Sequence, residues 1–200
     1  MELLNAVNYL LSLSGGAEVD SLEHNLPDIN AARIRIDEAT RTLLKRGWWF
    51  NTDPCVTLSP DEGTKEITLT NILKVKGLSQ FVTLQNGKLY DPHTRSYEFS
   101  GDVTVELVNS YPWEFLPESA QDYIMYKAGH DMVVHELEDL NKAQYLSREV
   151  QEAMLQLKKE EIELQPRNVL NTPSVQGLRS RVKPYRQNRY INPNYPGGRA

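Results

Sequence analysis

Apolar residues near the start of the chain recur at helical spacing and predict an amphipathic helix. Glycine adopts the left-handed conformation that ends a helix at little cost, so Ser14-Gly15-Gly16 predicts the end of this helix. A loop through Leu26-Pro27 then separates it from the next apolar pattern. The positions that define the first helix are Leu3, Leu4, Val7, Leu10 and Leu11.

A second stripe, in steps of three and four, predicts a helix that packs on a partner helix through one face. Asp28 is its predicted N-cap. Gly47 is its predicted stop, after Lys45-Arg46, whose positive charges suit the helix dipole. The stripe consists of Ile29, Ala32, Ile36, Ala39 and Leu43.

The middle of the chain changes to short β-branched runs bounded by turn residues, which are typical of strands. Asn86-Gly87 predicts a type I′ hairpin, because both central residues must tolerate positive φ. We therefore expect an antiparallel β subdomain over about 52–110. The predicted strand segments are Cys55-Val56-Thr57-Leu58, Ile67-Thr68-Leu69, Phe81-Val82-Thr83-Leu84, Lys88-Leu89-Tyr90 and Val103–Val108.

Helical spacing returns after Pro112. Pro117 is expected at the first helical position, with Glu118 in the first turn. This third helix carries Ala120, Tyr123, Ile124, Ala128 and Val134. A fourth helix is expected to begin near Asp139 and, if it continues to Leu164, to span roughly 40 Å. Its apolar stripe is Leu140, Ala143, Val150, Met154, Leu157 and Leu164.

From Pro166 onward, prolines lie among Asn, Arg, Gly and Tyr, and we expect an extended arm with little capacity to bury itself. The predicted fold class is α+β: a four-helix bundle with an inserted antiparallel β subdomain and an extended C-terminal arm. The expected divisions are an N-terminal helical pair at 1–51, the β insertion at 52–112, a second helical pair at 113–165 and the arm at 166–200.

Charge separates the arm from the rest. The 15 basic and 27 acidic residues before position 166 give −12, whereas the arm has seven basic residues and no acid. Cys55 is the single cysteine, which excludes an intrachain disulfide and favours assembly in a reducing cytoplasm. The apolar start does not resemble a signal peptide, because Glu2 stands where basic residues are expected. No run approaches the roughly 18 apolar residues of a membrane span.

Residues suited to catalysis are present but form no recognised pattern. His130, Asp131, His135 and Glu136 lie close together in sequence, yet the two histidines are five apart and lack zincin spacing. We expect neither a metal nor another cofactor. A glycoside hydrolase needs two carboxyl groups roughly 5 to 9 Å apart. The candidate acids of the β unit are Glu98, Asp102, Glu106 and Glu114.

Two aromatic-rich segments have a binding interpretation. Trp48-Trp49-Phe50 is a possible stacking platform, although core packing is favoured. In the arm, basic and aromatic residues interleave, which suits either nucleic acid or an acidic protein surface. Because the rest of the chain is acidic, contact with an acidic protein surface is favoured over contact with nucleic acid. The candidate contact residues are Arg179, Arg181, Lys183, Tyr185, Arg186, Arg189 and Tyr190.

An ordered set of segments resembles the tail tubular protein A family of short-tailed bacteriophages. The first part is Ala6-Val7-Asn8 with Leu10, the Gly15-Gly16 break and Val19–Glu23. The most specific part is Arg46-Gly47-Trp48 followed by Phe50-Asn51. The third is Leu116-Pro117-Glu118 with Tyr123-Ile124 and Lys127-Ala128. The resemblance covers about 1–160 and does not extend to the arm.

This resemblance implies a structural virion protein and no enzyme. It implies a homo-oligomeric ring, twelve subunits, between the portal protein and the tail nozzle, tail tubular protein B, with tail fibres attached nearby. Phage DNA would pass through the bore without specific binding, and no membrane partner or cofactor is implied. Two alternatives stay open at this point: a tail-associated polysaccharide hydrolase and, more weakly, a DNA-binding packaging factor that uses the arm.

Overall fold

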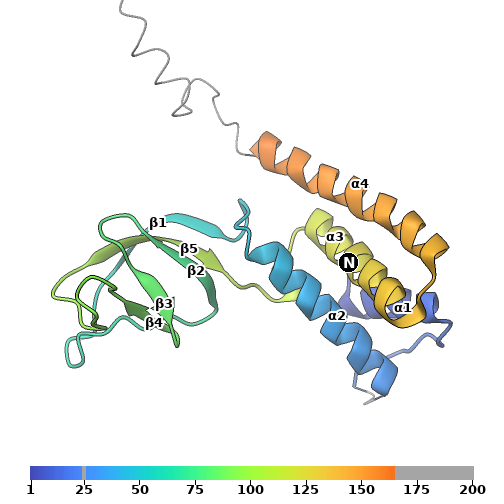
Figure 1. Cartoon of the computed structure of the whole chain (residues 1–200), viewed down its shortest axis with the longest axis horizontal. Helices are drawn as coiled ribbons and strands as arrows, with labels where there is room; N and C mark the ends of the chain where they lie inside the picture. The colour runs from blue at the N-terminus through green and yellow to red at the C-terminus, as the bar shows by residue number, and fades with distance from the viewer. Residues whose placement is uncertain (24–25, 165–200) are drawn as a thin grey trace, which may run out of the picture. The chain divides into compact units, whose positions relative to one another are not determined.

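The computed structural model describes residues 1–23 and 26–164, and in these the fold is α+β, as the sequence predicts. Helices α1 (Leu3–Ser14) and α2 (Pro27–Leu44) precede the strands, and α3 (Glu118–Met132) and α4 (Leu140–Leu164) follow them (Figure 1). A short 3-10 helix, Trp113–Phe115, leads from the last strand into α3.

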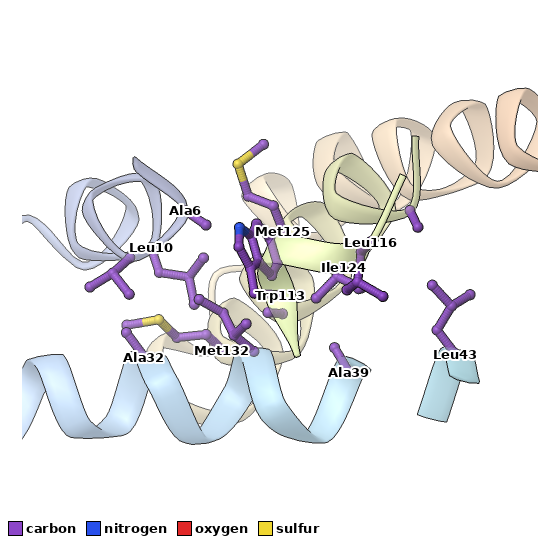
Figure 2. Packing of buried hydrophobic residues seen from close by; sticks show 14 of the residues in the cluster. Ala6, Leu10, Ala32, Ala39, Leu43, Trp113, Leu116, Ile124, Met125 and Met132 are labelled. Carbon is purple, nitrogen blue, oxygen red and sulfur yellow. The ribbon is translucent and has the colours of Figure 1, made fainter. Parts of the chain in front are cut away.

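Helix α3 packs against each of the other three helices and is central to the helical core. Figure 2 shows side chains of α1, α2 and α3 converging there, among them Leu10, Ala32, Ile124 and Met132. The predicted inner stripe of α2, from Ile29 to Leu43, is buried throughout, which confirms it. Closure of the four helices into a bundle stays a prediction, since α3 alone contacts all the others strongly.

The ends of the first two helices follow the glycine signals more closely than the capping signal. Gly15 has a φ of 77° and Gly47 a φ of 79°, so both predicted stops lie in the left-handed region. The prediction of Asp28 as N-cap is wrong: Leu26 takes that position and Pro27 is the first helical residue. Proline is favoured there because its φ is already helical and its missing N–H is not needed. Asp28 lies instead in the first turn.

The strands form two antiparallel sheets. The first has the order β1 (Thr52–Leu58), β5 (Val103–Asn109), β2 (Ile72–Gly77). The second is the hairpin of β3 (Thr83–Gln85) and β4 (Lys88–Tyr90). Its turn, Asn86-Gly87, has φ values of 51° and 73°, which confirms the hairpin prediction. Residues of both sheets share a second apolar core that includes Ile67, Val82, Leu89, Phe99 and Val105.

Two strand predictions differ from the structure. Residues 67–69 form one isolated bridge, Thr68 with Lys88, and 81–82 precede β3 without joining it. Strand β2 was not predicted, because Lys74 and Lys76 interrupt the apolar run. Its alternating burial nevertheless fits a strand with one covered face.

Helix α3 begins at Glu118, so Pro117 directly precedes it and does not occupy its first position. Val134 is not part of its buried stripe. It lies beyond the helix, in a π-helical segment, Val133–Leu137, and its side chain is exposed. The helices of the described residues include none long and apolar enough to cross a membrane.

The start of α4 agrees with prediction, because Asp139 accepts hydrogen bonds from the backbone N–H groups of Asn141 and Lys142. The predicted stripe is wrong at both ends, where Leu140 and Leu164 are exposed. Leu140 lies about 100° around the helix from buried Leu157. Leu164 lies one turn beyond Glu160, which already contacts Ser119 in the first turn of α3, so little of α3 remains to cover it.

Candidate interaction surfaces

A buried polar junction joins the helical core to the sheet. The amide of Asn51, fully buried, donates to the carbonyl oxygens of Leu44 at 3.1 Å and Asn109 at 2.8 Å. Its Oδ1 accepts the backbone N–H of Trp48 at 2.8 Å. The backbone N–H of Asn109 returns a bond to the Asn51 carbonyl at 2.8 Å. One side chain therefore fixes the end of α2, the start of β1 and the end of β5.

Trp48-Trp49-Phe50 belongs to the core, which confirms the favoured interpretation. Trp48 is buried and donates its indole N–H to the carbonyl oxygen of Leu43 at 2.9 Å. The Arg46 guanidinium lies 4.6 Å from its ring centroid, and Trp49 packs edge-on against Phe50. The arginine and tryptophan around Gly47 thus anchor the helix end and present no open stacking platform.

A hollow of about 820 Å³ lies where α2 faces the strands. Leu3, Ile36 and Arg41 line its helical side, while Leu69 and Ile72 contribute from the sheet side. The hollow is mixed in character, with apolar walls and the polar side chains of Asp37, Asn71 and Glu114. Such a surface is suited to contact with another protein.

The four acids singled out for hydrolysis lie on separate elements. Glu98 lies outside the strands, in an isolated bridge with Glu66, and Asp102 precedes β5. Glu106 lies on β5, where Lys76 of β2 pairs with it at 3.4 Å. Glu114 lies in the 3-10 helix and lines the hollow beside α2. The arrangement is that of ordinary surface carboxylates.

A smaller cleft of about 430 Å³ lies between α2 and α3 and is rich in cations. It is lined by Arg35, Glu38, Arg41, Lys45, Lys127, Asp131 and His135, among others. Lys127 donates to Asp131, and His130 lies 3.2 Å from the same carboxylate. Burial alone would raise the pKa of Asp131, but the hydrogen bonds from Lys127 and His130 outweigh it and lower that pKa.

Among the described side chains, His130 and His135 lie in different contacts. His135 lines the cleft, whereas His130 contacts Asp131. Residues 1–23 and 26–164 contain no group of three or more His, Cys, Asp or Glu side chains placed to hold a metal ion. The side chain of Glu136 is not among those described.

Tyrosines connect α1, α3 and α4. Tyr9 packs edge-on against Tyr126 with ring centroids 5.9 Å apart. Burial, with Tyr126, Tyr145 and Glu149 nearby, raises the pKa of Tyr9 to about 12. The Tyr145 hydroxyl bonds to Glu149, and this bond raises the pKa of Tyr145. Tyr9 and Tyr126 therefore join α1 to α3, and Tyr145 of α4 lies close enough to both to influence their pKa values.

The outward side of α4 is the surface that sequence reasoning missed. Tyr145, Leu155 and Ile162 are 63%, 65% and 70% exposed. The signal is present in the sequence, because their spacing of ten and seven residues defines a second apolar line on the same helix.

The predicted arm contacts, from Arg179 to Tyr190, lie outside the described residues.

Comparison with known proteins assigns a family to this chain. A family model described as tail tubular protein matches residues 4–166. Tail tubular protein A of Klebsiella phage KP34 is 24% identical over 147 residues, which cover 72% of this chain and 79% of that protein. The matched span contains α2, both sheets, α3, α4 and nearly all of α1.

Proposed function

The chain belongs to the tail tubular protein family, a structural component of the phage virion tail and not an enzyme, and from this premise we propose that it forms a ring that connects the portal to the tail nozzle. The observation that carries the proposal is the extent of the family match, which spans the whole helix–sheet–helix unit. The polysaccharide hydrolase that the sequence left open is wrong, since the family is structural.

The proposed mechanism is geometric. Twelve subunits close a ring, one side receives the portal protein, and the other receives the nozzle, tail tubular protein B, close to the attachment of the tail fibres. Residues 1–165 carry −12. Phage DNA passes such an acidic bore without specific binding, whereas a basic wall would hold its phosphates. Assembly takes place in the host cytoplasm before the subunit becomes part of the virion tail.

The proposal divides the chain into four functional parts. Helical pairs at 1–51 and 113–165 form the body, as a four-helix bundle, and the β subdomain at 52–112 extends from it through the Asn51 junction. The basic segment 166–200 is an assembly arm that contacts portal or a neighbouring subunit. Extended at about 3.1 Å per residue, it reaches on the order of 100 Å. Its seven positive charges offset the repulsion between bodies that each carry −12.

Co-sedimentation with purified portal tests this proposal. We expect the full-length chain to sediment with portal, and binding to weaken as salt rises, because the arm's contact is electrostatic. A chain that ends at Gln165 should keep its circular dichroism spectrum and lose portal attachment or ring closure. Portal-bound rings formed equally well by the shortened chain would contradict the arm's role. If truncation instead abolishes DNA binding while portal complexes form normally, the arm contacts DNA.

A further inference from the structure

Helix α4 has an outward stripe that nothing in the described part of the chain covers. Positions three and four apart along it are all exposed. Its apolar members are Tyr145, Leu155 and Ile162, with exposed fractions of 63%, 65% and 70%. The spacing is that of a helix face that packs on another helix. The stripe consists of Tyr145, Arg148, Glu152, Leu155, Lys159 and Ile162.

Helix α2 has a comparable outward stripe beside the basic cleft. Ile34, Glu38, Arg41 and Lys45 are exposed and lie at spacings of four, three and four. Ile34 is 56% exposed, although its neighbour in the chain, Arg35, lines the cleft. Within residues 1–23 and 26–164, Arg41 and Lys45 form no ion pair. Helix α3 packs against both α2 and α4, so the two stripes belong to helices on different sides of it (Figure 1).

The two stripes match in spacing and in charge. When the helices lie parallel, Ile34 faces Tyr145, Glu38 faces Arg148 and Arg41 faces Glu152. Each charged contact then joins opposite signs, and Leu155 lies on the aliphatic stem of Lys45. A polyanion would be a poorer occupant, because Glu38 and Asp131 lie among the cations of the cleft and nucleic acid would leave Leu155 uncovered.

We propose that the outward face of α4 of one copy docks on the outward face of α2 of a second copy. The two faces differ, so the contact is heterologous. Each subunit offers its α4 face to one neighbour and its α2 face to the other, which is the arrangement that closes a ring. The inference rests on the proposed ring and adds the faces through which its subunits meet.

Charge exchange in the full-length protein tests the contact by sedimentation velocity over a concentration series. Arg41→Glu and Glu152→Arg should each weaken association about tenfold or more, because each places like charges together. The double variant exchanges the two charges of the Arg41–Glu152 pair at every subunit interface, leaves Glu38 and Arg148 unchanged, and should return association to nearly that of wild type. Both side chains are exposed, so an unchanged thermal melt is expected for each variant.

Matched controls separate this contact from general effects of charge and hydrophobicity. Glu62→Arg makes the same change of charge as Glu152→Arg, at an exposed residue of the sheet region, and should not weaken association. Leu155→Ala should weaken it, whereas Leu140→Ala, also exposed but off the stripe, should not.

Rings that form equally well with Arg41→Glu, Glu152→Arg and Leu155→Ala would overturn the proposed faces and leave the proposed function intact. Weakening by both reversals without recovery in the double variant would also overturn the pairing. A wild type that stays monomeric with and without portal contradicts the proposed function and, with it, this interface.

Discussion

Replacing Asn51 with alanine should be among the most destabilising single changes at the junction of helices and sheet. The change removes an acceptor from the Trp48 N–H and a donor from the carbonyl oxygens of Leu44 and Asn109. The Leu44 carbonyl oxygen still accepts a hydrogen bond from the backbone N–H of Gly47 at 3.0 Å, so it loses only one of its two partners. A buried polar group without a partner costs about 1 to 3 kcal/mol. We therefore expect a total loss of about 2 to 4 kcal/mol in the free energy of unfolding.

Urea unfolding followed by tryptophan fluorescence measures this loss, because Trp48 lies at the junction. Asn109→Ala is the matched control: its amide donates to Asp53 at 2.6 Å in an exposed position, so its removal should cost well under about 1 kcal/mol. If the junction alone couples the two cores, Asn51→Ala should also broaden the transition or split it. A loss no larger than that of Asn109→Ala would refute the assignment of Asn51 as the structural junction.

Three further predictions concern packing, backbone and charge. Ile36→Ala should cost about 2 to 5 kcal/mol in urea unfolding, since Ile36 is 2% exposed, whereas Ile34→Ala, on the outer face, should change little. Gly47→Val should cost about 2 kcal/mol or more in the free energy of unfolding, because the φ of Gly47 is 79° and an added Cβ would lie 3.1 Å from Thr52 Oγ1. Gly101→Val is the control, because a Cβ at Gly101 would meet open space. Equal losses in the two variants would refute the argument. The pKa of Asp131 is lowered in the folded state, so its contribution to stability is present above about pH 4, the ordinary range of the group, and is lost as pH falls through the folded pKa. The stability difference between wild type and Asp131→Asn should therefore vanish in acid, and a difference that persists unchanged in urea titrations at low pH would contradict this.

The helices were predictable from local signals because each has apolar residues at helical spacing and a glycine, proline or capping residue near one end. Gly15 and Gly47 adopt the left-handed conformation that their positions suggested, and Asp139 caps α4. The start of α2 was misplaced because Pro27 and Asp28 both signal a helix start, and proline took the first position. The N-cap therefore lies two residues earlier than predicted, at Leu26 and not at Asp28.

Contacts between residues that are far apart in the sequence could not be predicted from local signals. Asn51 gains its role from Asn109, 58 positions away, and no local pattern connects them. The pattern of α4 contains two apolar lines, and the sequence alone does not tell which one α3 covers. The structure covers the line through Ala143, Leu146 and Leu157 and leaves Tyr145, Leu155 and Ile162 outside. Strand β2 also depends on a distant partner: it pairs with β5, although its two lysines interrupt the apolar pattern typical of a strand.

Electron microscopy of the purified full-length protein, alone and mixed with portal, tests the central claim most directly. The ring proposal predicts closed rings of uniform diameter with an open centre, and with portal present it predicts stacked particles in which the ring covers one portal face. Single-particle averages would show the subunit number, expected to be twelve. Particles that remain monomeric in both samples, with portal rings left uncovered, would contradict the account.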